Sequence, residues 1–245
     1  MPIFDVHAHI GVWPFPIPAC DIGDVRALMR RFDIGACAIS SAKAIVYDME
    51  EGNVETARAI ADCEGALGYV VVNPNALERS CAELDRYYVQ PKFVGAKIHP
   101  SYSRTATGSD AMRALVAEVA ERGRPLLIHC GGESEVAAAD RLAADFPRLR
   151  IILGHGGAGA WREGAQAAAA RPNVYVEFCG SIAHRGKIAQ AARIAGAEKV
   201  LFGSDLTLLD PGYMLGLVED AALDQRETEM ILWRNARNLF EEWMP

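Results

Sequence analysis

Histidine in this chain occurs at the ends of short apolar segments, where five of the six histidines stand. The segments are FDVHAHI, VGAKIHP, PLLIHCGG and IILGHGG, and a fifth segment, VLFGSDL, carries a carboxylate near its end. Successive side chains of a strand alternate between its two faces, so we expect Asp5, His7 and His9 to share one face. Burying such groups costs several kcal/mol each unless they are hydrogen-bonded, paired or bound to a metal. The strand ends are therefore expected to hold an ion or a ligand.

The residue types at these ends fit one divalent cation. The expected ligands are three imidazoles and one carboxylate, from His7, His9, His129 and Asp205. Such a set suits Zn2+ and leaves a position for water, whose pKa a bound metal lowers to about 7. Asp205 would also accept a proton from that water, and His155 would stabilise developing charge or protonate a leaving group. Both are expected to be catalytic residues.

Eight strand-like segments, each followed by a helical one, would position these residues. The strands are expected to begin near Ile3, Gly35, Leu67, Phe93, Pro125, Arg150, Asn173 and Val200. Clear helical patterns cover Asp24 to Phe32, Asn53 to Cys63, Asp110 to Arg122, Glu135 to Phe146 and Lys187 to Ala195. This α/β alternation predicts parallel strands with right-handed crossovers, and eight units favour a closed (β/α)8 TIM barrel over an open sheet. The segment from Asp224 to Trp243 is expected to add an extra C-terminal helix.

A barrel of this kind predicts where the polar residues meet. Active sites of (β/α)8 barrels lie at the C-terminal ends of the strands, where all the histidine-bearing ends would converge. One His-x-His motif by itself could be satisfied by backbone partners. Five polar strand ends with the same inward parity favour a shared pocket.

Length and composition are consistent with one enzyme domain over residues 1–245. A (β/α)8 barrel needs roughly 250 residues. The net charge of −7 and the lack of a basic run argue against nucleic acid as a partner. We expect no signal peptide and no membrane span, because neither a leader pattern nor 18 consecutive apolar residues occurs. Six cysteines without a CxxC pair indicate reduced thiols and a cytoplasmic location.

The motifs together resemble those of a known family. DVHAHI, KIHP, LIHCGG, LGHGG, FGSD and RNARNLF, in this order, are similar to the amidohydrolase superfamily, in particular its amidohydrolase-related (amidohydrolase 2) branch. The resemblance spans nearly the whole chain and implies a (β/α)8 barrel with one divalent metal ion. It implies His7, His9, His129 and Asp205 as ligands, and His155 as either the catalytic histidine or a histidine that supports the ligands from outside. The branch includes hydrolases of amides, esters and lactones, and non-oxidative decarboxylases resembling aminocarboxymuconate-semialdehyde decarboxylase.

The fourth strand leaves alternatives open. In binuclear members of the superfamily a lysine of this strand is carbamylated and bridges two metals, and Lys97 matches it. In the related branch one metal is usual, which we favour here. Lys97 would then neutralise inner carboxylates such as Asp5 and face the substrate, or be a paired and inert buried amine. His99 lies nearer the strand end and is expected to contact either the substrate or the metal ligands.

Residues after the strands are candidates for substrate binding. Trp13, next to Phe15 in the segment GVWPFPIP, would form an apolar wall, and Tyr102 and Arg104 follow the fourth strand. Arg104 would bind a substrate carboxylate through two hydrogen bonds. Glu177 on the seventh strand is a further candidate, although a surface or loop-packing role explains any single one of these residues better. Together they predict a small, partly aromatic, carboxylate-bearing molecule. No loop is long enough for a deep lid, so the pocket is either open or closed by a second copy in a homo-oligomer.

Three functions are compatible with these residues. The expected one is a metal-dependent hydrolase of a small amide, ester or lactone that uses a metal-activated water. The alternative is a non-oxidative decarboxylase with the same metal site, because charges that stabilise an oxyanion also stabilise an enolate-like intermediate. A metal-free barrel that binds a small metabolite is the third. Release of carbon dioxide would separate the second from the first.

Overall fold

Seven parallel strands form one sheet whose order follows the chain from β1 to β7. The computed structural model describes residues 1–182 and 184–244. The strands are β1 (Ile3–Ile10), β2 (Ile34–Ser41), β3 (Ala66–Val71), β4 (Phe93–Ile98), β5 (Leu126–His129), β6 (Ile151–Gly154) and β7 (Val174–Val176). Parallel neighbours require a crossover between each pair of strands. The sheet is therefore of the α/β, TIM-barrel-like type that the alternating pattern predicts.

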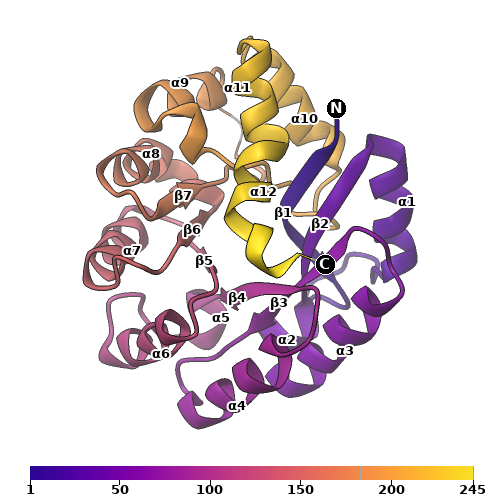
Figure 1. The fold of residues 1–245 in the computed structure, drawn as a ribbon, viewed down its shortest axis with the longest axis vertical. Helices are drawn as coiled ribbons and strands as arrows, with labels where there is room; N and C mark the ends of the chain where they lie inside the picture. Colours follow the sequence, from indigo (N-terminus) through magenta and orange to yellow (C-terminus); the bar gives the residue numbers. More distant parts are fainter. Residues whose placement is uncertain (183, 245) are drawn as a thin grey trace.

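The crossovers are helical and form an outer layer around the strands (Figure 1). They are α1 (Ile22–Phe32), α2 (Ala42–Val46), α3 (Met49–Ala61), α4 (Leu77–Tyr88), α5 (Pro100–Ser103), α6 (Asp110–Glu121), α7 (Glu133–Asp145) and α8 (Trp161–Ala170). Two further helices, α9 (Lys187–Ala195) and α10 (Pro211–Asp220), follow β7. Helix α1 begins with a capping box in which Asp21 and Asp24 bond to each other's backbone N–H groups. All five helices expected from the sequence are present, and their ends differ from the expected ones by at most four residues.

The segment that was expected to form an eighth strand from Val200 onward forms no regular strand in the described residues. Val200 makes one isolated parallel bridge to Val176 of β7, and Leu206 makes another to Ala8 of β1. The segment thus lies between the first and last strands without a regular ladder. Asp205 has a φ of 61°, in the left-handed region, which interrupts an extended strand at this point. The apolar pattern alone could not reveal this change of backbone conformation.

The C-terminal segment, expected as one helix, is helical in consecutive pieces. They are α11 (Gln225–Glu229), a π-helical turn (Met230–Arg234), α12 (Asn235–Phe240) and a 3-10 turn (Glu241–Trp243). The ring of Phe240 lies 5.5 Å from that of Phe4 near the start of β1 and 6.2 Å from that of Tyr69 in β3. Figure 1 shows this segment in yellow, lying across the strands. It packs at the starting end of β1, away from the strand ends that carry the histidines.

A register shift in β1 changes the expected alternation. Asp5 pairs with Cys37 of β2, but Ala8 pairs with Ile39, so three steps along β1 match two steps along β2. An extra residue of this kind re-aims the side chains that follow it. Asp5 and His7 therefore do not continue one uninterrupted face, contrary to the simple alternation expected from the sequence.

Candidate active site

His7, His9 and Asp205 meet at the C-terminal end of β1. Nε2 of His9 lies 3.3 Å from Oδ1 of Asp205, and Nε2 of His7 lies 3.9 Å from the same oxygen. The oxygen is buried and has no hydrogen-bond partner among the described residues. One ligand atom from each of the three residues lies within 4.8 Å of the others. The structure thus brings together three of the four expected metal ligands.

The other ring nitrogen of each β1 histidine is already held. Nδ1 of His7 donates to Oε1 of Glu177 at 2.7 Å, and Nδ1 of His9 donates to the carbonyl of Ser40 at 3.3 Å. Burial lowers the pKa of both imidazoles, so both are neutral and keep a lone pair on Nε2. The lone pair of His9 faces the unpartnered oxygen of Asp205, and that of His7 faces both this oxygen and Nζ of Lys97 at 2.8 Å, so positive charge is favoured where these groups meet. These donor types and their outer partners fit a divalent metal ion.

His129, the third expected imidazole ligand, stands at the end of β5. Its ring stacks on that of His99 at 3.9 Å and meets the ring of His155 edge-on at 4.6 Å. Burial, with the charges of His155 and Lys97, lowers the pKa of His129 to about 2. It is therefore a neutral group that lines the same cavity as Asp205. It does not lie in the compact group of ligand atoms, and its role as a ligand stays a prediction.

Lys97 is fully buried, and its Nζ lies 2.8 Å from Nε2 of His7. Burial lowers the pKa of this amine to about 8. The expected partner Asp5 binds elsewhere: it accepts hydrogen bonds from the backbone N–H and the hydroxyl of Ser204. The register shift in β1 explains the difference, because it separates Asp5 from the face that carries His7. Lys97 therefore contacts the candidate ligand His7, and the carboxylates whose charges act on it are Asp205 and Glu177 and not Asp5.

Glu177, expected as a substrate contact, lies beneath the cavity and is fully buried. Besides the hydrogen bond from Nδ1 of His7, it accepts hydrogen bonds from the backbone N–H of His155 at 2.7 Å and from that of Cys179 at 2.7 Å. All three bonds hold parts of the protein, and Glu177 is absent from the cavity lining. It is a positioning residue one layer below the strand ends.

His155 begins the 3-10 turn that follows β6, with a φ of 60°. A non-glycine residue in this region is uncommon and marks a constrained position. The ring is held through Nδ1, which donates to the carbonyl of Cys179 at 3.1 Å. Gly156 and Gly157 continue the turn at positive φ, where glycine carries no steric cost. The remaining nitrogen, Nε2, is the one free to exchange protons with the cavity.

Two adjoining cavities of about 370 and 230 Å³ share His129, His155 and Asp205. The larger one has an aromatic wall, in which Trp13 stacks on Phe15 at 5.6 Å with an angle of 19° between the rings. The other lining residues of the larger cavity are His7, His9, His99, Ser101, Tyr102 and Leu208. A flat apolar wall opposite a group of polar atoms is typical of a small-ligand site. Trp13, His99 and Tyr102 thus lie where the sequence predicts.

Arg104, expected to bind a substrate carboxylate, is the exception. It is exposed at the end of α5, in the left-handed region with a φ of 51°, and lines neither cavity. The short helix α5 turns the chain away from the strand end before Arg104 is reached. A different basic residue, Lys187 at the start of α9, lines the smaller cavity. Sequence reasoning passed over Lys187, because in the sequence it is only the first residue of an amphipathic helix.

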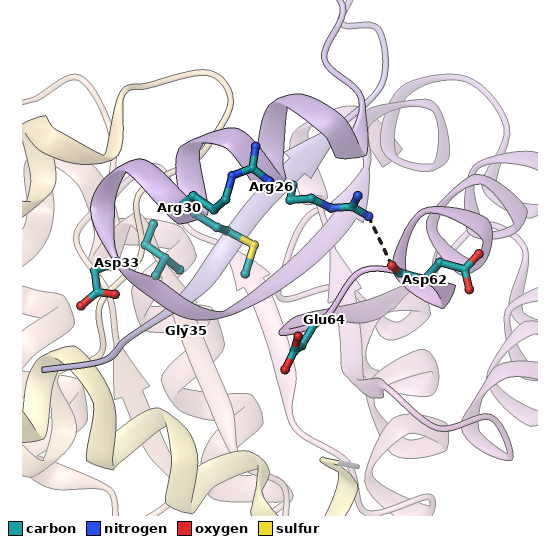
Figure 2. Close-up of a pocket in the computed structure, with 8 residues that line it drawn as sticks. Arg26, Arg30, Asp33, Gly35, Asp62 and Glu64 are labelled. Carbon is teal, nitrogen blue, oxygen red and sulfur yellow. Dashed lines mark hydrogen bonds between the residues drawn. The ribbon is translucent and has the colours of Figure 1, made fainter.

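A larger cavity of about 530 Å³ lies away from the histidines, beside α1, the start of β2 and the end of α3 (Figure 2). Arg26 there donates to the carbonyl of Asp62 at 3.2 Å, and Arg30, Asp33 and Glu64 complete a rim of both charge signs. These charged side chains are solvent-exposed. The buried imidazoles and the orphaned carboxylate place the candidate active site at the opposite side of the strands. Within residues 1–182 and 184–244, no helix is long and apolar enough to cross a bilayer.

The family model described as amidohydrolase matches residues 4–241. The chain belongs to the amidohydrolase family. This confirms the resemblance expected from the motifs. No curated protein matches the chain by sequence.

Several solved structures share the fold of this amidohydrolase. A TIM-barrel protein from Bordetella bronchiseptica is 16% identical with a TM-score of 0.76, and the match covers 99% of both chains. A 5-carboxyvanillate decarboxylase from Sphingomonas paucimobilis is 14% identical with a TM-score of 0.76, covering 98% of this chain and 99% of that one. A dihydroxybenzoic acid decarboxylase from a Polaromonas species, solved with manganese and the inhibitor 2-nitroresorcinol, is 19% identical with a TM-score of 0.74, covering 98% and 97%. These likenesses support the TIM-barrel-like fold.

Proposed function

We propose that this amidohydrolase-family protein is a metal-dependent non-oxidative decarboxylase of a small aromatic carboxylic acid. Residues 1–245 would act as one catalytic domain. Two solved structures of the same fold are decarboxylases of aromatic acids, which favours the alternative over the hydrolysis we expected first. The observation that carries the proposal is that one cavity is lined both by the aromatic wall of Trp13 and Phe15 and by Asp205, whose buried oxygen has no hydrogen-bond partner among the described residues.

The proposed metal site comprises the four ligands expected from the sequence, His7, His9, His129 and Asp205. We propose one divalent ion there; Zn2+ is the expectation from the ligand types, and the Polaromonas relative holds manganese. Such an ion would supply positive charge to hold an anionic oxygen of the substrate. Glu177 and Ser40 hold the outer nitrogens of His7 and His9, so the imidazoles are set in one orientation before any ligand binds.

The protein's own residues would bind the ring and move the proton. Trp13 and Tyr102, whose ring centroids lie 5.9 Å apart, would form one aromatic wall against which the substrate ring packs. Decarboxylation breaks the bond between a ring carbon and its carboxylate, whose carbon leaves as carbon dioxide, and the ring carbon takes a proton. His155 is proposed to deliver this proton through Nε2 when both ring nitrogens carry a hydrogen, and it is left as a neutral imidazole whose Nδ1 hydrogen stays on the carbonyl of Cys179. His99 would contact the substrate from the wall shared with His129.

Release of carbon dioxide tests the proposal. The metal-loaded protein is incubated with 5-carboxyvanillate and with dihydroxybenzoic acids, and carbon dioxide and the ring product are measured. We expect one carbon dioxide for each ring product. Asp205→Asn should reduce release to background and lower the bound metal, because it removes the charge that faces His7 and His9. Asp33→Asn, a change at an exposed aspartate far from the histidines, is the matched control and should keep full activity.

The hydrolase and the metal-free binding protein are outcomes of the same experiment. Cleavage of an ester, lactone or amide panel without any carbon dioxide from aromatic acids would overturn the decarboxylase and support hydrolysis. Less than about a tenth of an equivalent of metal per chain after purification without chelator would support the metal-free protein.

A further inference from the structure

Lys187, the first residue of α9, is buried and has no acidic partner in the part of the chain that the structure describes. Only 2% of its surface is exposed, and its Nζ donates to the carbonyls of Phe178 at 3.2 Å and Ile182 at 3.3 Å. Among the described residues it forms no ion pair. Glu177 is the acid that acts on it most strongly, but the hydrogen bonds of Glu177 go to His7, His155 and Cys179. Lys187 is thus a buried cation whose charge is not directly neutralised.

This arrangement is unfavourable for folding by itself. A buried ammonium without a counter-ion loses its hydration and is seldom found in protein interiors. Its position at the start of a nine-residue helix adds to the cost, because the helix dipole places partial positive charge there. The first turn of α9 carries no acidic residue to offset either charge. An anion in contact with Lys187 would relieve both effects.

The space beside Lys187 is the smaller of the two cavities. It has a volume of about 230 Å³, and its lining includes His155 and Asp205 from the candidate catalytic group. An ammonium carries three N–H donors, and two of those of Lys187 are used by carbonyl groups. Among residues 1–182 and 184–244 the third donor has no hydrogen-bond acceptor, and the ring of Phe178 lies 5.5 Å from Nζ. Because Lys187 lines this cavity, that donor is available to a ligand there. A molecule that extends from Asp205 into the smaller cavity would therefore contact the proposed metal site at one end and the ammonium of Lys187 at the other.

We propose that Lys187 is a specificity-determining residue that donates a hydrogen bond to an anionic ring oxygen of the substrate. The inference rests on the proposed function and narrows its substrate class to aromatic acids that carry a ring hydroxyl. The carboxylate would bind on the side of Asp205, and the ring hydroxyl, ionised or polarised, would enter the smaller cavity. A charge-assisted hydrogen bond from a buried donor discriminates strongly against a ligand that lacks the acceptor.

Equilibrium binding tests this role without turnover. The metal-loaded protein is titrated in a calorimeter with 2,6-dihydroxybenzoate, which has ring hydroxyls, and with benzoate, which has none. We expect Lys187→Met to weaken binding of 2,6-dihydroxybenzoate by about 10- to 100-fold, the effect of losing one hydrogen bond to a charged group. Binding of benzoate should change less than about twofold. Lys187→Gln, which keeps donors for the two carbonyls, should give the same pattern and serves if the methionine variant does not fold.

Lys199 offers a matched control. Its Nζ also donates to two carbonyls, those of Arg171 at 3.3 Å and Pro172 at 2.5 Å, but it lines neither cavity. Lys199→Met should leave the affinity for both acids unchanged. Equal losses for both acids in the Lys187 variants, or no loss for either, would overturn the inference. Carbon dioxide is not measured in this test, so its result is separate from that of the decarboxylation assay.

Discussion

At the residue scale, one carboxylate organises the candidate site. Glu177 accepts hydrogen bonds from Nδ1 of His7 and from the backbone N–H of His155, each at 2.7 Å. The first bond leaves the lone pair of His7 on Nε2, facing Asp205, and the second holds the chain where His155 leaves β6. The buried carboxylate of Glu177 therefore fixes which nitrogen of His7 faces the proposed metal, and it also fixes the backbone position of His155, the proposed proton donor. This outer partner is expected to matter nearly as much as the ligands.

We predict that His155→Gln keeps the metal and loses activity by about 10²- to 10⁴-fold, the usual effect of removing an acid or base. The amide keeps hydrogen-bonding atoms but does not exchange a proton at neutral pH. Metal content by elemental analysis and kcat for carbon dioxide release are the two measurements. His184→Gln is the matched control, because His184 is exposed and lines neither cavity. An unchanged kcat in His155→Gln would leave His155 with a packing role only.

At the scale of elements, the turn after β6 is held against α8. A Cβ added to Gly164 of α8 would lie 2.1 Å from the carbonyl oxygen of Gly156, so the helix and the turn are in backbone contact. This contact keeps the turn that begins with His155 close to the strand ends. Glycine in a helix usually costs stability relative to alanine. Its presence at position 164 is explained by the close approach.

Gly164→Ala should therefore destabilise the protein by about 1–3 kcal/mol, the range for overpacking, and lower activity through displacement of His155. Gly216→Ala in α10 is the matched change, because no atom lies within 4 Å of the added Cβ. It should stabilise the protein by about 0.5–1 kcal/mol. Urea unfolding curves of both variants give the comparison. Equal effects of the two substitutions would contradict the proposed contact.

At the scale of the whole molecule, stability and chemistry lie at opposite ends of the strands. The C-terminal segment packs Phe240 against Phe4 and Tyr69 at the starting end, whereas the histidines occupy the other end. Phe240 is fully buried and belongs to the cluster that fills this end of the sheet. Packing changes there should alter folding without altering the candidate site.

Phe240→Ala is predicted to lower the free energy of unfolding by about 3–5 kcal/mol, because it leaves a cavity among buried aromatic rings. Metal content and kcat of the folded fraction should stay the same. Val89→Ala, at a side chain that is 84% exposed, is the control and should change stability by less than about 0.5 kcal/mol. A loss of metal in Phe240→Ala without a loss of stability would show that the two ends are coupled.

Local patterns in the sequence were sufficient for much of the fold. Apolar segments begin at Ile3 and Phe93, where β1 and β4 begin, and the helix expected over Lys187 to Ala195 has those bounds. Period and capping act within a few residues, so they can be read from neighbours in the chain. The expected eighth strand is replaced by a segment with isolated bridges and a left-handed residue, Asp205. An apolar pattern in the sequence does not reveal a left-handed residue.

The candidate ligands His7, His9 and Asp205 could be named from the sequence, because inward parity at strand ends implies convergence once the topology is known. The roles of Glu177 and Lys187 depend on three-dimensional placement. Glu177 contacts a histidine 170 positions away. Nothing in the sequence distinguishes Lys187 from other lysines, and only the fold buries it beside a cavity. Burial and long-range hydrogen bonds arise from packing between distant segments, and for this reason periodicity and residue type do not predict them.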